Sequence, residues 1–155
     1  MGGCLAPMNA YLNIIGMETL GLRMERICKN ALELAEALEK LEGVSVNYPL
    51  LDSSPYAELA NEQFGGRGGG ILTLRAGSKD RACQLMDMLK YVKIATNIGD
   101  IRTLVIHPAS TIYLHSSEEA KKATGVYDDM IRISVGIEDS VDLTEDFADA
   151  VKRLR

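Results

Sequence analysis

The sequence predicts an α+β fold with a small, mostly antiparallel sheet of about four strands and helices packed on one side of it. Four short segments of strand-like alternation are separated by segments of helical periodicity. These strands are too short, and their connections too varied, for a doubly wound parallel sheet. The chain has 155 residues, of which 46% are hydrophobic and 25% are charged. This length and composition suit a single domain with an adequate core.

One long amphipathic helix, or two helices joined by a bend, is expected over residues 7–41. Apolar side chains recur there at steps of three and four between charged residues. Gly16 and Gly21 are the weak points where a bend would fall, and Gly43 is the expected C-cap. The first half of the helix carries apolar residues on more than one side. Part of that half is therefore expected to be buried against something outside this chain.

A strand, a short helix and a glycine-rich loop follow. Apolar residues alternate over 44–48 until Pro49 ends the strand, and the serines before Pro55 predict a helix over 56–64. The stretch GGRGGG at residues 65–70 resembles a phosphate-binding loop only superficially, because neither Lys-Ser nor Lys-Thr follows it and the GxGxxG spacing is absent. A flexible loop is favoured here over a phosphate site.

The second half of the chain continues the alternation of strands and helices. We expect a strand over 71–75, a helix over 79–90, a strand over 92–98, and then an apolar patch at 104–106 followed by a polar loop. Two further helices are expected, one from Ser117 to Gly125 and one from Asp139 or Ser140 to the C-terminus. The last helix has an acidic start and a basic end, which matches the helix dipole.

Both histidines lie in or beside the loop after the apolar patch. His107 and His115 are eight residues apart and lack acidic or cysteine companions at ligand spacing. A hydrogen-bonded loop histidine is therefore favoured over a metal site. A triad of Ser110, His107 and Asp100 can be written, but no nucleophile elbow supports it. We expect neither a metal site nor a catalytic residue in this chain.

The segment Ile131 to Leu143 is the most informative part of the sequence. Ile131, Ile133 and Val135 alternate with Arg132 and Ser134, which predicts a strand with the arginine opposite its apolar face. A guanidinium is costly to desolvate unless it meets a carboxylate, a phosphate or a carbonyl. The residues alone leave two interpretations open: an internal ion pair or snorkelling stem, and a clamp for an anionic ligand.

Bulk properties exclude several classes of partner. The net charge is -5 and the basic residues are scattered, which disfavours a nucleic-acid surface. The cysteines Cys4, Cys28 and Cys83 are odd in number and far apart, as expected of reduced thiols. No apolar run approaches the ~20 residues of a membrane span, and the N-terminus lacks signal-peptide features. We expect a cytoplasmic protein that binds neither membranes nor nucleic acids.

Four stretches of the chain resemble a known family. They are GMETLGLRMERICKNA at 16–31, VNYP at 46–49, NIGDIRTLVIHPAST at 97–111 and RISVGIED at 132–139. In this order and spacing they are similar to the C-terminal domain of the Cys/Met-metabolism pyridoxal-phosphate (PLP) enzymes, and within that family to its O-acetylhomoserine sulfhydrylase branch. The resemblance implies that residues 1–155 are a single C-terminal substrate-binding domain.

The resemblance also implies which residues bind substrate. Arg132 stands at the position of the family arginine that binds the substrate α-carboxylate, and Asn97 matches a residue that helps hold it. Thr96 would add backbone contacts. Position 102 is a glutamate in cystathionine-cleaving relatives, and Arg102 would instead repel the distal ammonium of cystathionine. The chain departs from the family at Tyr113, where a histidine is usual.

The activity implied by the resemblance is γ-replacement, in which acetate leaves O-acetylhomoserine and sulfide or a thiol takes its place, giving homocysteine or methionine. The cofactor would be pyridoxal 5'-phosphate, held by an N-terminal domain with a Schiff-base lysine whose motifs this chain lacks. The chain alone would then bind no cofactor and be inactive. Its partners would be that domain, a small amino-acid substrate and further subunits of a homo-oligomer. The alternatives are a methionine γ-lyase-like elimination and a non-catalytic interaction or dimerisation module.

Overall fold

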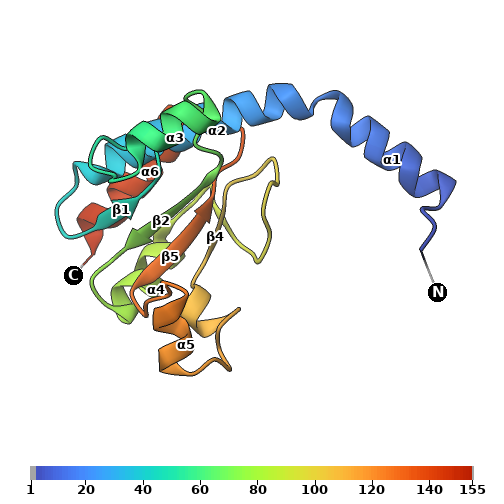
Figure 1. Cartoon of the computed structure of the whole chain (residues 1–155). Coiled ribbons are helices and arrows are strands. Elements are labelled where there is room, and N and C mark those ends of the chain that lie inside the picture. Colours follow the sequence, from blue (N-terminus) through green and yellow to red (C-terminus); the bar gives the residue numbers. More distant parts are fainter. Residues whose placement is uncertain (1–2, 155) are drawn as a thin grey trace.

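The computed structural model describes residues 3–154, in which a sheet is backed by helices and one helix projects from the body (Figure 1). The helices are α1 (Pro7–Glu18), α2 (Leu20–Glu39), α3 (Ala57–Phe64), α4 (Lys79–Met88), α5 (Glu118–Ala123) and α6 (Ser140–Arg153), with a 3-10 turn at Pro108–Ser110. The strands are β1 (Ser45–Asn47), β2 (Ile71–Arg75), β3 (Lys93–Ile94), β4 (Leu104–Ile106) and β5 (Met130–Ser134). The expected α+β class is confirmed.

The sheet has the order β1-β2-β5-β4-β3, so the strand nearest the C-terminus lies at its centre. β5 pairs antiparallel with β2 and β4, β1 pairs antiparallel with β2, and β3 pairs parallel with β4. The sheet is mostly antiparallel, as predicted, but it has five strands rather than four. The additional strand is β4, which was expected only as an apolar patch. All three of its residues are buried, so it lacks the alternation that marks a strand with one solvated face.

The core lies between the sheet and helices α2, α4 and α6, which cover one of its faces. Each helix contributes its apolar stripe, and the sheet contributes alternate residues of β2 and β5 together with Val105 of β4. The fully buried side chains with the largest volumes include Leu34 and Leu38 of α2, Leu85 of α4, and Leu143 and Phe147 of α6. This burial of apolar surface fixes which face of β5 points inward.

The long N-terminal helical region is divided in two. The break falls at Thr19, between the two glycines at which a bend was expected, and the Arg23 side chain donates hydrogen bonds across it to Thr19 Oγ1 and Gly16 O. The expected C-cap at Gly43 is wrong, because α2 ends at Glu39 with Lys40 as its cap. Gly43 has a φ of 81° in the turn that follows, where a left-handed conformation is still required.

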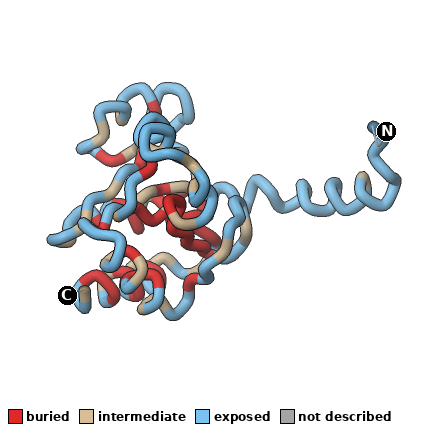
Figure 2. The backbone as a smooth tube through the Cα atoms, turned by 90° about the horizontal axis from the view of Figure 1, so that it is seen from below, coloured by how far each residue is buried: buried red, intermediate tan, exposed pale blue. Residues whose placement is uncertain are grey.

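Helix α1 extends away from the rest of the molecule, and it has no buried residue (Figure 2). Its apolar side chains are exposed on several sides: Met8, Tyr11, Leu12, Ile14, Ile15 and Met17. α2 has buried residues only from Ile27 onward. The prediction that the first half carries apolar surface that this chain does not cover matches the exposure of these side chains.

The glycine-rich stretch 65–70 packs against Tyr48 and Ile27. A Cβ at Gly68 would lie 2.6 Å from the hydroxyl oxygen of Tyr48, and a Cβ at Gly70 would collide with Cγ2 of Ile27. The Tyr48 side chain is fully buried and donates a hydrogen bond of 2.9 Å to Gly69 O. Gly68 therefore allows the backbone to approach the buried Tyr48 ring, and Gly70 allows it to approach the Ile27 side chain, which is a packing role.

Replacement of Tyr48 by phenylalanine should make the protein less sensitive to alkaline unfolding. Burial, and the nearby Cys28 thiol, raise the pKa of Tyr48 above its ordinary value of 10.0. The unfolded chain therefore loses this proton first, and the stabilisation, fully present below pH 10, is lost by about 1.4 kcal/mol per pH unit as the pH rises toward the folded-state pKa. Tyr48→Phe should lose ~1 kcal/mol at pH 7 with the hydrogen bond.

Urea unfolding at pH 7 and at several values above pH 10 measures this difference. Tyr127→Phe is the matched control, because Tyr127 is exposed and its loss should leave the pH dependence unchanged. Parallel stability curves for the wild-type protein and Tyr48→Phe above pH 10 would contradict the assignment.

Candidate functional site

Arg132 lies at the centre of the sheet, on the face that α2, α4 and α6 do not cover. Its neighbours in β5, Ile131 and Ile133, are fully buried in the core. Because side chains alternate along a strand, Arg132 must point to the opposite face. The register places it between Thr73 of β2 and Ile106 of β4. The partly buried Arg132 is therefore flanked by a strand on each side.

The Arg132 guanidinium is only partly satisfied by the protein. Its Nη2 donates a hydrogen bond of 3.2 Å to Asn97 O. Its Nε is buried and has no partner among residues 3–154. None of the four ion pairs formed within that part of the chain includes Arg132. A partly buried guanidinium with a free donor favours binding of an external anion over an internal ion pair.

Two depressions meet at Arg132. One has a volume of about 270 Å³ and is lined by Thr96, Asn97, Ile98 and Arg132. The other has a volume of about 330 Å³ and is mainly apolar; it is lined by Thr73, Pro108, Ile112, Tyr113, Val126, Met130 and Arg132. The structure thus brings together Arg132, Asn97 and Thr96, which the family resemblance had singled out, and it adds Tyr113 in the second depression.

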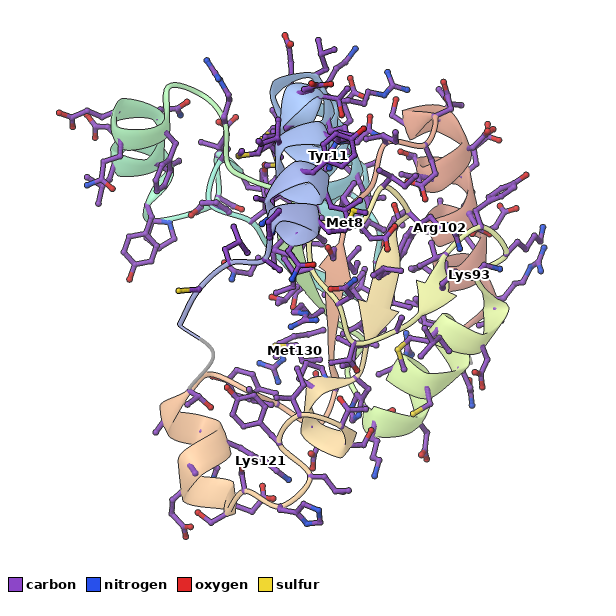
Figure 3. All side chains as sticks on the ribbon, turned by 90° about the vertical axis from the view of Figure 1, so that its right-hand side faces the viewer. Met8, Tyr11, Lys93, Arg102, Lys121 and Met130 are labelled. Atoms are coloured by element: carbon purple, nitrogen blue, oxygen red, sulfur yellow. The ribbon has the colours of Figure 1, made fainter. Side chains whose placement is uncertain are left out.

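Arg102 lies apart from this group. It is exposed in the loop before β4, and its N–H donates to Asp100 Oδ1 at 3.0 Å. In Figure 3, Arg102 and Met130 lie toward opposite ends of the sheet. Arg132 is paired with Ile106, and position 102 lies four residues before Ile106, in a bend that precedes β4. Arg102 does not line either depression at Arg132.

The loop that carries Asn97 is fixed by β5. Asn97 Oδ1 accepts a hydrogen bond of 2.9 Å from the Ile98 N–H, and Ser134 Oγ accepts one of 3.3 Å from the Gly99 N–H. Ser134 is 2% exposed, so its hydroxyl is shielded from solvent. The sequence reasoning gave Ser134 no role. Its position two residues after Arg132, on the same face of the strand, is the signal that could have identified it.

His107 is a buried structural residue. Its Nδ1 accepts a hydrogen bond from the Ser110 N–H at 3.3 Å and lies 2.7 Å from Ser110 Oγ, while its Nε2 lies 2.6 Å from Asp128 O. These partners fit a neutral ring protonated on Nε2. The ring nitrogen Nε2 of His107 thus contacts the carbonyl oxygen of Asp128 and not the Asp100 carboxylate. The Ser110–His107–Asp100 triad therefore does not form. The preference for a hydrogen-bonded loop histidine is confirmed.

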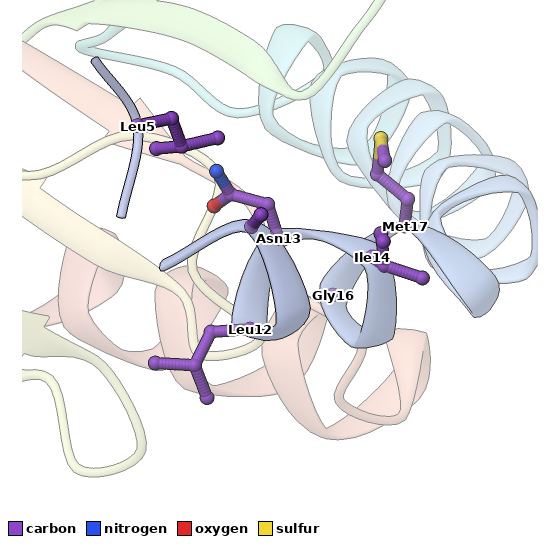
Figure 4. Close-up of a pocket in the computed structure, with 7 residues that line it drawn as sticks. Leu5, Leu12, Asn13, Ile14, Gly16 and Met17 are labelled. Carbon is purple, nitrogen blue, oxygen red and sulfur yellow. The ribbon is translucent and has the colours of Figure 1, made fainter. Parts of the chain in front are cut away.

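A further hollow of about 570 Å³ lies along α1 and is lined by Leu5, Ala10, Leu12, Asn13, Ile14, Gly16 and Met17. Figure 4 shows the side chains of Leu12 and Met17 pointing away from the helix in different directions. The lining contains no titratable group. This hollow therefore belongs to the exposed apolar surface of α1 and offers no chemistry of its own.

The residues around Arg132 do not fit pyridoxal phosphate. A PLP site needs an amine to hold the aldehyde carbon, and no lysine lines either depression. The glycine-rich loop offers no phosphate cradle beside them, because Gly68 and Gly70 are packed onto Tyr48 and Ile27. Within residues 3–154 no cluster of three or more His, Cys, Asp or Glu could hold a metal ion, and no described helix is long and apolar enough to span a membrane.

Comparison with known proteins identifies the family. An O-succinylhomoserine sulfhydrylase of Pseudomonas aeruginosa is 40% identical over 148 residues, which are 95% of this chain and 37% of that protein. An L-methionine gamma-lyase of Treponema denticola is 38% identical over 99% of this chain and 38% of its own length. The crystal structure of an O-acetylhomoserine (thiol)-lyase of Campylobacter jejuni, which contains a pyridoxyl-lysine monophosphate, has a TM-score of 0.92 at 36% identity, covering 97% of this chain and 36% of that one.

The chain therefore spans somewhat more than a third of the length of these relatives. The profile of the family described as "Cys/Met metabolism PLP-dependent enzyme" matches residues 1–152, nearly the whole chain. This chain belongs to the Cys/Met metabolism PLP-dependent enzyme family.

Proposed function

We propose that this chain is the C-terminal, substrate-carboxylate-binding domain of a PLP-dependent O-acetylhomoserine sulfhydrylase. In the assembled enzyme, acetate is lost from O-acetylhomoserine and sulfide or a thiol is added, giving homocysteine or methionine. The observation that carries the proposal is Arg132, a partly buried cation on the uncovered face of the sheet with a free Nε donor. The names of the similar proteins support the same substrate class, an amino acid of the homoserine and methionine type.

Arg132 binds the α-carboxylate of the substrate. A planar guanidinium can form two parallel charge-assisted hydrogen bonds to a carboxylate, and this fixes the orientation of the Cα–H bond. Asn97 holds the guanidinium through its carbonyl oxygen at 3.2 Å. Thr96, beside it in the same depression, contributes backbone contacts to the carboxylate. Arg102 lies outside both depressions, so its charge would act on the substrate only from a distance, where it disfavours a distal ammonium, as in cystathionine, and favours a neutral acyl ester.

The cofactor and its lysine come from a cofactor-binding domain that residues 1–155 do not provide, whether it belongs to the same polypeptide or to another. No step of the chemistry is assigned to this chain, which binds and orients substrate and is inactive by itself. The three cysteines are free thiols, which supports a cytoplasmic location.

Helix α1 is the surface on which the cofactor-binding domain docks. Its exposed apolar residues, including Tyr11, Leu12, Ile14 and Met17, cover most of its circumference and leave one polar side. Such a helix is stabilised when its apolar sides are enclosed. Enclosure requires more surface than one partner helix supplies. We therefore place α1 in a groove of the cofactor-binding domain, within a homo-oligomer.

Reconstitution tests the proposal. Mixing this chain with a separately produced cofactor-binding domain and PLP should give thiol-dependent release of acetate from O-acetylhomoserine, whereas either part alone should give none. Leu12→Asp should reduce the activity by at least about tenfold, because a charge in an apolar interface is costly. Asn9→Asp, which adds the same charge to the polar side of the helix, is the control. Activity of this chain alone, or equal activity of the two variants, would contradict the proposal.

The same assay separates the alternatives. A methionine γ-lyase-like enzyme, which the similarity to the Treponema denticola protein favours, would form 2-oxobutanoate without added thiol. A non-catalytic interaction module, favoured by the exposed surface of α1, would dimerise or bind a partner domain without any turnover. Size-exclusion chromatography with light scattering detects the dimer, and a monomer that binds neither amino acid nor partner domain would exclude every binding function considered for this chain.

A further inference from the structure

The turn that follows β5 is held in place by helix α2. The Asn30 side chain is fully buried, and its Nδ2 donates hydrogen bonds to Gly136 O at 3.1 Å and to Glu138 O at 2.8 Å. Arg26 Nη2 donates to Glu138 O as well, at 3.1 Å. These bonds fix the backbone of the turn. The direction of the Glu138 side chain is therefore fixed at its base.

The Glu138 carboxylate holds Thr103, the residue that ends the loop between β3 and β4. Its Oε1 accepts from the Thr103 N–H at 2.5 Å, and its Oε2 accepts from Thr103 Oγ1 at 2.8 Å. The Gly136 N–H donates to the same Thr103 hydroxyl at 2.9 Å, and the Ile137 N–H donates to Ile101 O at 2.9 Å. Thr103 is fully buried, so its N–H and hydroxyl have no access to water and depend on this carboxylate.

The segment closed by Thr103 is the one that carries the proposed substrate contacts. It leaves β3 at Ile94 and includes Thr96 and Asn97, and its Gly99 N–H donates to Ser134 Oγ. Asn97 O accepts the hydrogen bond from Arg132 Nη2. The loop is thus attached to β5 at Arg132 and Ser134. It is attached to the turn that follows β5 at Gly136, Ile137 and Glu138.

We propose that Glu138 is a positioning residue for the carboxylate clamp. By holding Thr103, it fixes the loop that orients the Arg132 guanidinium and presents the Thr96 and Asn97 backbone to the substrate. This inference rests on the proposed binding of an α-carboxylate by Arg132. It adds to that proposal a link from Asn30 of α2, through the Gly136–Glu138 turn, to the loop. Helix α2 and the clamp at Arg132 therefore share one network of hydrogen bonds.

NMR titration of this chain with O-acetyl-L-homoserine tests the inference. The resonances to follow are the Arg132 Nε–H and the amides of residues 96–99. Glu138→Ala should shift these resonances in the absence of ligand and weaken binding on the order of tenfold, because a displaced loop misorients the clamp. Glu138→Gln keeps one acceptor for the Thr103 N–H, so its affinity should lie between those of the wild type and Glu138→Ala.

Two controls separate positioning from general destabilisation. Glu145→Ala removes an exposed glutamate of α6 and should leave both the shifts and the affinity unchanged. O-Acetylhomoserine amide, which lacks the carboxylate, should bind equally to the wild type and to Glu138→Gln. Thermal unfolding of each variant shows that the titrations are made on folded protein.

The outcomes distinguish this inference from the proposed function. If the wild-type Arg132 Nε–H does not respond to O-acetyl-L-homoserine, the clamp itself is wrong, and the role of Glu138 is wrong with it. If Arg132 responds but both Glu138 variants bind with wild-type affinity, only the positioning role is wrong. If the Glu138 variants lose as much affinity for O-acetylhomoserine amide as for O-acetyl-L-homoserine, Glu138 is a purely structural residue.

Discussion

Replacement of Arg132 by alanine in the proposed O-acetylhomoserine sulfhydrylase should lower kcat/KM for O-acetylhomoserine by about a thousandfold. Two charge-assisted hydrogen bonds to a carboxylate in a partly buried site contribute ~4 kcal/mol together, and each ~1.4 kcal/mol corresponds to a factor of ten in rate. Most of the loss should be a higher KM for the amino acid, because the proposed clamp would bind the carboxylate before and during the reaction. Arg132→Lys should recover only part of it, since an ammonium cannot bind both oxygens in one plane.

Steady-state kinetics at saturating thiol measure this effect. Arg75→Ala is a suitable control, because Arg75 also lies in the sheet but already forms an ion pair of 2.9 Å with Asp129 and stacks on Tyr127 at 4.1 Å. Its loss should change KM for the amino acid little. Wild-type activity in Arg132→Ala, without a large rise in KM, would exclude the clamp.

Replacement of Gly136 by alanine should destabilise the protein by roughly 3 kcal/mol and lower its Tm by about 10 °C. A Cβ at this position would collide with the carbonyl oxygen of Ile101 and would lie 2.6 Å from the carbonyl carbon of Arg102. Both are backbone atoms of the loop that Glu138 holds, so they cannot move aside without breaking the hydrogen bonds of Thr103. The new methyl group therefore strains the fold and also displaces the loop that carries Thr96 and Asn97.

Differential scanning calorimetry measures the change in Tm. Gly21→Ala is the matched control, because a Cβ at Gly21 would meet no atom within 4 Å, and alanine is the better helix former by up to ~1 kcal/mol. Its stability should equal or exceed that of the wild type. A Gly136→Ala variant as stable as Gly21→Ala would show that the turn after β5 can relax, contrary to the packing described here.

The local elements followed from the sequence because their patterns are local. The alternation around Arg132 predicted β5 and the face on which the arginine lies, and the spacing of apolar residues predicted α4 and α6 to within one or two residues. The serine and aspartate caps were also predictable: Ser117 and Asp139 each accept a hydrogen bond from the first turn of their helix. The exposed apolar surface of α1 needed only the distribution of its residues around the helix.

The candidate site was predictable in part. The proximity of Asn97 and Arg132, 35 residues apart, followed from the family resemblance and not from any local pattern. Neither the local patterns nor the family resemblance placed Arg102 outside the depressions at Arg132. The distance between these two arginines depends on the register of β4 against β5. The fifth strand was missed for a different reason: three buried residues in a row show no period.

By itself, the sequence determined which face of most helices and strands is apolar, where most of the helices begin, and that one arginine lies opposite the core face of its strand. Only the tertiary structure decided that β5 lies between β2 and β4, that Glu138 reaches back to Thr103, and that Gly68, Gly70 and Gly136 are sites of close backbone approach. The physical reason is range. Periodicity records the environment of neighbouring residues, whereas strand order and side-chain hydrogen bonds join segments that are distant in the chain and meet only when the core is packed.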